Sequence, residues 1–479
     1  MNILAFVFAA LVVCAELGYA QGPAMPPAPA TAPASVPQGG LMLPQAGGNF
    51  QGSVAAAQPA TSLRLSLQDA LDRGLRNNLG LLVTQTGSRI ASIERRRALA
   101  ALLPTVGGQV IETEQQIDLA SFGFHFPGVP SVIGPFHYFD AQASLSQKIF
   151  DWTSIKNRQS AIQSERAAEL SVKDARDLVV QAVASAYLAI IADGARVSAA
   201  QAEVDTAQAL YNRARDQHQA GVSPAIDELR AQVELRTRQQ QLLAAANQLD
   251  KDKLALGRVI GLPDGQSFEL ADTAPYVPLE AMTPRQAIER AHKNRADYQS
   301  AMLQVRAAET AREAAVAERY PAAQVDADYG AIGVAPNSSH GVFTVSGGVR
   351  FNIFDAGRIR ADIEQADAVI KQRKDELANL EAQIGYQIRT ALLDLKTAAD
   401  QVSVAQDNLS LANQTLAQAR DRFSAGVADN LEVVQAQDSV AAANESLISA
   451  IYLHNVAKVS LARAVGEAET SLKEFMGGK

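Results

Sequence analysis

The stretch AGVSPAIDELRAQ (residues 220–232) returns further along the chain as AGVADNLEVVQAQ (residues 425–437). Each copy places a glycine, Gly221 or Gly426, directly after a long segment without proline. Glycine readily adopts the left-handed conformation that ends an α-helix, and the residues that follow are typical of helix N-termini. Each stretch therefore predicts a tight tip between two helices. The expected tip turns are 220–224 and 424–429.

The segments that lead into the tips predict very long helices. Residues 154–219 and 358–423 contain no proline and one glycine each, and they are rich in Ala, Gln, Glu, Arg and Leu. A helix of that length extends roughly 100 Å at about 1.5 Å per residue. No globular core can bury such a helix, so it must pair with other helices along its length. The segments after the tips, 225–258 and 430–465, are expected to be its partners.

The tips belong to a tandem repeat of the whole chain. The sequence LQDALDRGLRNN from Leu67 resembles PRQAIERAHKNR from Pro284, at an offset of 217 in the numbering (67 to 284). The sequence KIFDWTSIKNR from Lys148 resembles NIFDAGRIRAD from Asn352, at an offset of 204 (148 to 352). Each half is expected to contain a helix, a hairpin region, a very long helix, a tip and a helix. The halves are 61–270 and 271–479, and the second opens with a helix at 284–319.

The two hairpin regions, about 105–149 and 322–353, change from a helical period to a period of two. Apolar side chains alternate with polar ones, as in a strand with one face in lipid and one in water. Of the 26 aromatic residues, 13 fall within 120–152 and 320–354, which suits aromatic girdles at bilayer interfaces. An ordinary sheet on a soluble core would alternate in the same way. The predicted lipid-facing residues are Phe139, Leu145, Phe343, Val345, Val349 and Phe351.

The N-terminus predicts export. The apolar run from Ile3 to Val13 is too short to cross a bilayer but suits a signal peptide at residues 1–20, and small residues precede a cleavage point after Ala20. Residues 21–60 are rich in Pro and Ala and predict a flexible leader. The formal net charge of −8 argues against a nucleic-acid partner, and the single cysteine, Cys14, allows no intramolecular disulfide.

No constellation for catalysis is visible in the sequence. The six histidines are dispersed, and there is no phosphate-binding loop, no nucleophile elbow and no zinc-protease motif. The carboxylates are spread along the expected helices at charge-pair spacing. We expect no enzyme activity, no cofactor and no metal site.

Taken together, these features resemble the TolC-like outer-membrane efflux proteins. The resemblance covers about residues 62–466 and is carried by the repeat, by FDAGR from Phe354, and by the tail from Arg422 to Gly466. It implies a mainly α-helical fold with a membrane β-barrel. Four strands from each of three identical chains would form one twelve-stranded barrel, and the long antiparallel coiled-coil helices would continue it as a periplasmic tunnel. A periplasmic adaptor and an inner-membrane pump would be the partners, with outer-membrane lipid around the barrel.

The resemblance also implies roles for the tips. Asp227 and Glu432 match acidic positions of the family's periplasmic entrance, and Phe423 occupies an aromatic position, often tyrosine, at the same entrance. Either carboxylate would also interact favourably with the helix dipole in the first turn of a helix, and this purely structural role is the alternative to a role at the entrance. The tip-turn residues expected to contact the adaptor are Gly221, Val222, Gly426 and Val427.

Two other functions remain open at this point. A periplasmic coiled-coil scaffold or adaptor would have the same helices but no barrel, and an enzyme would need a constellation that the sequence lacks. Within the efflux interpretation, drug efflux, metal efflux and type I protein secretion use the same kind of outer component. The sequence does not choose among these cargoes.

Overall fold

The computed structural model describes residues 50, 52–55, 63–273, 276–279, 282–425, 427 and 430–475 of the chain. The expected signal peptide, most of the expected leader and the tip residue Gly426 lie outside the described residues.

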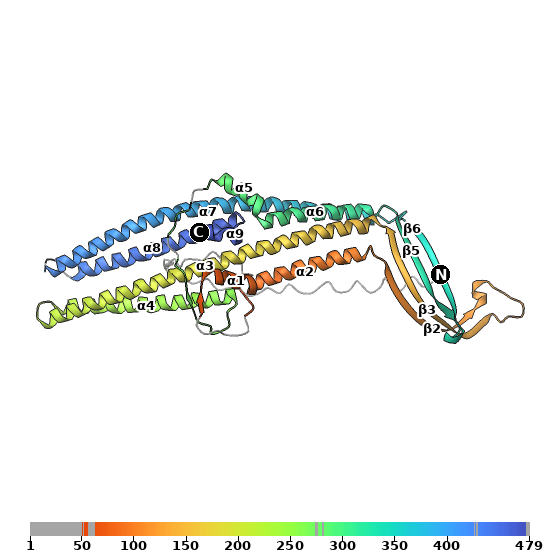
Figure 1. Cartoon of the computed structure of the whole chain (residues 1–479), viewed down its shortest axis with the longest axis horizontal. Coiled ribbons are helices and arrows are strands. Elements are labelled where there is room, and N and C mark those ends of the chain that lie inside the picture. The colour runs from red at the N-terminus through yellow and green to blue at the C-terminus, as the bar shows by residue number, and fades with distance from the viewer. Residues whose placement is uncertain are drawn as a thin grey trace, which may run out of the picture. The chain divides into compact units, whose positions relative to one another are not determined.

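The first half contains two short helices, a hairpin, a very long helix and its partner (Figure 1). Its elements are β1 (Leu63–Leu65), α1 (Leu67–Asn77), α2 (Leu79–Ala100), β2 (Thr105–Asp118), β3 (Val132–Phe150), α3 (Trp152–Gln219), α4 (Ala225–Ile260) and β4 (Phe268–Leu270). The second half repeats the order of the longer helices and the hairpin and ends with an additional short helix. Its elements are α5 (Pro284–Asn294), α6 (Ala296–Ala317), β5 (Ala322–Gly333), β6 (His340–Arg350), α7 (Arg358–Ser424), α8 (Asn430–Ala464) and α9 (Ala468–Phe475).

The helices lie side by side in an order that changes along α3 and α7. Toward the tips, α7 contacts α8, α8 contacts α3, and α3 contacts α4. Toward the sheet, α2 contacts α3, α3 contacts α6, and α6 contacts α7. One lateral edge of the described helices is therefore formed by α2 and α4, and the other edge by α7.

A four-stranded antiparallel sheet continues from the ends of α2, α3, α6 and α7 (Figure 1). The strand order is β2-β3-β5-β6, so the central contact, between β3 and β5, joins the two halves of the chain. The edge strands among the described residues are β2 and β6. A register shift between Gln115 and Ile117 interrupts the pairing of β2 with β3.

The expectation of one continuous helix over 284–319 is wrong. The backbone of Arg295 is extended, with φ −67° and ψ 117°, and it separates α5 from α6. Its guanidinium is 3% exposed and donates hydrogen bonds to Asp297, to Gln387 of α7 and to the carbonyl of Ala464. The break places this cation where α5, α7 and α8 meet. The helix propensity of residues 284–319 does not reveal these contacts, because they come from distant parts of the chain. In the first half, Asn78 separates α1 from α2 in the same way.

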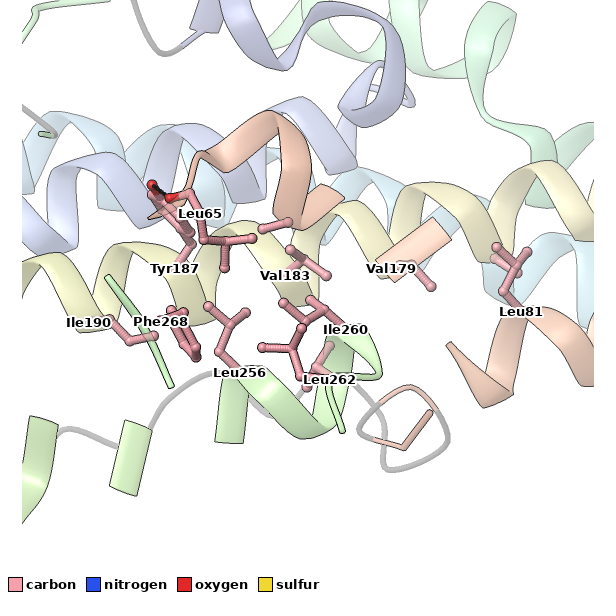
Figure 2. Packing of buried hydrophobic residues seen from close by; sticks show 13 residues of the cluster. Leu65, Leu81, Val179, Val183, Tyr187, Ile190, Leu256, Ile260, Leu262 and Phe268 are labelled. Atoms are coloured by element: carbon pink, nitrogen blue, oxygen red, sulfur yellow. Dashed lines mark hydrogen bonds between the residues drawn. The ribbon is translucent and has the colours of Figure 1, made fainter. Parts of the chain in front are cut away.

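Sequence reasoning also missed three short elements. Strands β1 and β4 pair in parallel, and α9 forms within what looked like a short tail. Figure 2 shows Leu65 and Phe268 of these strands packed with Tyr187 of α3 and Ile260 of α4. The Tyr187 hydroxyl oxygen lies 3.0 Å from the Leu65 carbonyl and 3.0 Å from the Asp272 carboxylate, so its one proton is shared between two acceptors.

Among the described residues, α3 alone is long and apolar enough to pass a composition test for a membrane-spanning helix. Most of that apolar window, 61%, is buried inside the protein. Val183, Tyr187 and Ile190 belong to the cluster of Figure 2, and Val180 and Leu188 pack against α8. The apolar character of α3 is therefore explained by its contacts with other helices.

The close approach of α1 to α3 depends on the absence of a side chain at Gly74. A Cβ atom added there would lie 2.7 Å from Cγ2 of Val183 and 3.4 Å from Cγ1 of Val179. We expect Gly74→Ala to lower the free energy of unfolding by about 1–3 kcal/mol through overpacking. Denaturant unfolding of the detergent-solubilised protein, followed by circular dichroism, measures the change.

Gly194→Ala is the matched control, because Gly194 is helical and an added Cβ would meet no described residue within 4 Å. The control should gain up to about 1 kcal/mol from helix propensity. Equal effects of the two substitutions would show that the contact between α1 and α3 is not tight.

Candidate functional sites at the helix tips and on the sheet

The first tip is closed by backbone hydrogen bonds at the end of α3. The N–H of Val222 donates to the carbonyl of Gln217 at 2.9 Å, and the N–H of Gly221 donates to the carbonyl of His218 at 2.9 Å. This is the Schellman pattern, and it requires the left-handed φ of +71° that Gly221 adopts. At the second tip, the N–H of Val427 donates to the carbonyl of Arg422 at 3.0 Å. Val222 and Val427 are both exposed at the turns.

The two acidic tip residues lie in the first turns of α4 and α8. An Asp227 oxygen lies 3.7 Å from Nη1 of Arg230, one turn further along α4. An oxygen of Glu432 lies 3.3 Å from Nη1 of Arg422, near the end of α7. Asp227 is thus paired within its own helix, whereas Glu432 links the two helices of its hairpin.

Phe423 lies between the two hairpins rather than at a free surface. Its ring packs on a cluster formed by all four long helices, and the guanidinium of Arg213 on α3 lies 5.4 Å from its centroid. A cation over an aromatic face is attractive even without a phenolic hydroxyl. The buried members of the cluster are Leu210, Ala214, Ala231, Leu416, Ala419, Val433 and Ala436.

Further from the tips, a buried arginine joins three helices. Arg238 of α4 is 6% exposed and donates to Glu234 on its own helix at 2.6 Å and to Glu203 of α3 at 3.2 Å. It also donates to Asp438 of α8, across the contact between the halves. Burial raises the pKa of Glu203, and the charge of Arg238 opposes that shift.

A second arginine, Arg196 of α3, also crosses to α8. Its Nε donates to the Glu445 carboxylate at 3.0 and 3.1 Å, and its Nη1 donates to Asp193 at 2.8 Å. The pKa of Asp193 is raised to about 6, mainly by burial and in second place by a hydrogen bond with Asp252 of α4. Ionisation of Asp193 at neutral pH therefore costs stability that Arg196 only partly restores. A cavity of about 460 Å³ lies between the two arginines, so charge pairs rather than close apolar packing join the halves there.

The strand register gives the sheet one apolar and one polar face. Residues directly opposite each other in antiparallel strands share a face, and successive residues alternate. One row across the four strands is therefore apolar and the next is polar. The apolar row is Val106, Leu145, Ala327 and Val345, and the polar row is Thr105, Ser146, Asp326 and Ser346.

Five of the six residues expected to face lipid lie in β3 or β6 on the same side of the sheet as the apolar row, and the sixth, Phe351, follows β6. All are exposed except Phe139, which is half-buried, and Phe351 lies one residue beyond the end of β6. Strand β2 is less regular, because Glu112 and Glu114 also fall on this side, opposite Phe139 and His137.

Sequence reasoning missed Arg196 and Arg238. Their only sequence signal is a carboxylate three or four residues away, which is common on any solvated helix. Their partners on α8 lie 249 and 200 residues away along the chain, so only the tertiary structure brings them together. No group of three or more His, Cys, Asp or Glu side chains suited to a metal ion occurs within the described residues.

A family model described as outer membrane efflux protein matches the chain twice, at residues 70–262 and 287–467. The chain belongs to the outer membrane efflux protein family. The starts of the two matches are offset by 217 (70 to 287) and their ends by 205 (262 to 467), which agrees with the internal repeat. The resemblance drawn from the sequence is thereby confirmed, and the family places this protein in the outer membrane as an efflux channel rather than an enzyme.

Relatives that are similar in sequence are named as components of efflux systems. The cation efflux system protein CusC of Escherichia coli O6:H1 is 27% identical over 338 residues, which cover 66% of this chain and 70% of CusC. The probable efflux pump outer membrane protein TtgC of Pseudomonas putida is 25% identical over 324 residues, which cover 64% of each protein.

Solved structures share the fold. VceC of Vibrio cholerae has a TM-score of 0.73 at 16% identity and covers 84% of this chain and 96% of its own. The CmeC channel of Campylobacter jejuni has a TM-score of 0.73 at 17% identity, with coverage of 91% and 98%. These likenesses show a mainly helical outer-membrane efflux channel fold.

Removal of the Arg238 guanidinium should loosen the contact between the halves. We expect Arg238→Met to lower the free energy of unfolding by about 2 kcal/mol, because Glu203 and Glu234 lose their partner in a poorly hydrated site. Denaturant unfolding in detergent tests this. Arg236→Met is the control, since Arg236 is exposed and, among the residues that the structure describes, donates only to Gln239 within the same helix. A loss in the control as large as in Arg238→Met would contradict the role of the buried cluster.

Proposed function

We propose that this protein is the exit duct of a tripartite efflux system, a homotrimer whose barrel crosses the outer membrane and whose helices form a periplasmic tunnel. Substrates delivered by an inner-membrane pump and an adaptor would pass through it passively. The observation that carries the proposal is a two-faced sheet whose two edge strands have no strand partner within the described part of the chain.

The two-faced sheet is suited to lipid on one side and water on the other. Its apolar face carries Val, Leu, Phe and Tyr side chains that no described part of the chain covers, including Phe343 and Tyr329, which lie opposite each other. Its other face carries Ser, Thr, Gln and Asp side chains, among them Gln324, which donates to Ser146 and Asp326. This alternation is that of an outer-membrane barrel with a polar lumen.

The unpaired edges require more than one copy. Strands β2 and β6 each offer a row of backbone N–H and C=O groups, and such groups cannot remain unsatisfied in hydrocarbon. Four strands are too few to close around a lumen, whereas three copies supply twelve. Because β2 differs from β6, the contact would run head to tail and close by rotation.

The helical edges support the same closure. Helices α2 and α4 on one edge and α7 on the other expose large apolar side chains, which is costly for a solvated coiled coil. On α2 these are Leu79, Val83, Ile90 and Ile93; on α4 they are Ile226, Leu229, Val233, Leu243 and Leu254; on α7 they are Val369, Tyr386, Leu393, Val404 and Leu411. Packing of α7 against α2 and α4 of the next copy would bury them.

The tips would form the periplasmic entrance and contact the adaptor. Gly221, Val222, Gly426 and Val427 are proposed as docking residues, and Asp227, Phe423 and Glu432 as residues that help hold the entrance closed. The support for the closing role is that Phe423 and Glu432 engage neighbouring helices close to the turns. The relatives are named for cation, antibiotic and toluene efflux and for pyoverdine export, so the proposal stops at efflux and names no cargo.

The native mass of the full-length protein, extracted in mild detergent from isolated outer membranes, tests the assembly. A species of three chains is expected. A single soluble chain recovered from the periplasm would contradict the channel and favour a coiled-coil scaffold.

The membrane face can be tested with two neighbouring residues of β6. Val345→Arg places a charge on the apolar face, which should cost about 2–4 kcal/mol near the bilayer centre and reduce the amount of assembled trimer in the outer membrane. Ser346→Arg places the same charge on the polar face and should assemble normally. Immunoblots of unheated outer-membrane fractions compare the two. Normal assembly of Val345→Arg would mean that this face does not meet lipid.

If Asp227 and Glu432 help hold the entrance closed, a variant without their charges should conduct more ions than the wild type. Asp227→Asn combined with Glu432→Gln should raise single-channel conductance in planar bilayers, because ion pairs near the turns are lost. Asp205→Asn, far from the tips on α3, should leave conductance unchanged. If the double variant conducts like the wild type, the two carboxylates act only on their helix N-termini.

A further inference from the structure

A cavity of about 560 Å³ lies beside the segment that joins the two halves of the chain. Residues from within 276–284 line it together with side chains of α7 and α8. Most of the lining is apolar and includes Leu279 and Met282, which precede α5, and Leu392 and Leu393 of α7. Sites for small molecules have this size and character, and a few polar groups orient the ligand. The polar groups of this cavity therefore indicate what it binds.

Two exposed cations of α7, Arg389 and Lys396, line the cavity. They are seven residues apart, which places them on one face of the helix, about 10 Å from each other along its axis. In the part of the chain that the structure describes, neither cation forms an ion pair. No described carboxylate lines the cavity. Its charged groups among the described residues are thus all positive.

One buried polar side chain, His454 of α8, also lines the cavity. It is 1% exposed, and its Nδ1 has no hydrogen-bond partner among the described residues. The ring of Tyr276 lies against the imidazole, with the two centroids 4.7 Å apart. Burial, and in second place the charge of Lys458, lowers the pKa of His454, while a hydrogen bond with Asn455 opposes the shift. Because a buried nitrogen without a partner is costly, His454 indicates a ligand that supplies one.

A buried cation lies directly behind this part of the cavity. Lys458, one turn further along α8, is 1% exposed, and its Nζ donates to the carbonyl of Val277. Val277 stands between Tyr276 and Pro278, and both of these line the cavity. Within the described residues Lys458 has no carboxylate partner, and desolvation lowers its pKa. Fully buried lysines normally have an anionic partner, so the charge of Lys458 also favours an anion in the cavity.

We propose that this cavity binds a small organic carboxylate with an apolar, aromatic body. The apolar body packs against Leu279, Met282 and Leu392, and the rings of Tyr276 and His454 offer it aromatic surfaces. The carboxylate accepts a hydrogen bond from Nδ1 of His454, since a neutral imidazole can carry its proton on either nitrogen.

The three cations at or beside the cavity stabilise the negative charge of the ligand. The site lies away from the tip turns and from the sheet, so it is separate from the proposed entrance and barrel. In the proposed trimer the next copy would cover Leu393, which is one of the lining residues. Binding is therefore measured on the assembled protein.

Calorimetric titration of 1-naphthoate into the full-length protein in lipid nanodiscs tests the site, with empty nanodiscs as the blank. Saturable binding of one naphthoate per chain is expected. The neutral analogue 1-naphthamide has the same ring system without the negative charge and should bind at least about tenfold more weakly. The absence of saturable naphthoate binding to the assembled protein, or equal affinity for the two probes, would overturn the proposal.

Variants of α7 test the role of the cations without touching the buried residues. Arg389→Gln combined with Lys396→Gln should weaken naphthoate binding about tenfold and leave naphthamide binding unchanged. The matched control, Lys371→Gln with Arg420→Gln, removes one exposed lysine and one exposed arginine of α7 that do not line the cavity. It should bind naphthoate like the wild type. Equal affinities in the two double variants would contradict the proposed site.

His454→Phe keeps a ring of similar size and removes Nδ1, so it should also lose the preference for naphthoate over naphthamide. Retention of that preference in an assembled His454→Phe variant would exclude the imidazole from the site. If this buried substitution prevents assembly, the α7 variants decide alone. The native mass of each sample is measured in parallel. A trimer that binds no naphthoate overturns only this inference, whereas a wild-type protein that is a single chain overturns the proposed duct.

Discussion

Backbone hydrogen bonding in lipid governs how this chain can be built. A sheet with one apolar face can enter the membrane only if its edge strands find partners, and β2 and β6 have none within the described chain. The same two edges continue along the helices as rows of exposed Leu, Ile, Val and Tyr side chains. The unpaired strand edges and the uncovered helix faces lie on the same two sides of the chain, and the proposed closure of several copies into a ring would cover both.

Charge pairs hold the halves together where packing is weakest. Between α3 and α8, one apolar cluster lies on the sheet side of Arg196 and another lies near the tips. Arg196 and Arg238 cross from one half to the other in the region between these clusters. Arg238 is buried and Arg196 is partly buried, and such arginines need several acceptors, so these contacts depend on carboxylates from more than one helix. The raised pKa of Asp193 shows that one of those carboxylates is held at a cost. The hairpins are therefore joined by a directional network rather than by a continuous core.

Much of the architecture could be predicted because it is periodic. Long helices follow from segments without proline, tips from glycine at a helix C-terminus, and strands from alternation, and each signal is local. Arg295 shows where local reasoning fails, because the helix break there is fixed by Asp297, Gln387 and Ala464, which surround the guanidinium. Strands β1 and β4 were missed for a related reason, since each has only three residues and is stable only against α3 and α4.

Patterns within short segments were enough to establish the repeat, the family, the compartment and the two-faced character of the strands. Which residues meet across the halves became visible in the folded chain alone. The fold places Phe423 against Arg213, and it places Arg238 among acceptors from three helices. It also leaves a particular set of apolar side chains uncovered at the two edges. Period and propensity fix how one element is built, whereas ion pairs and uncovered faces depend on how separate elements are brought together in space.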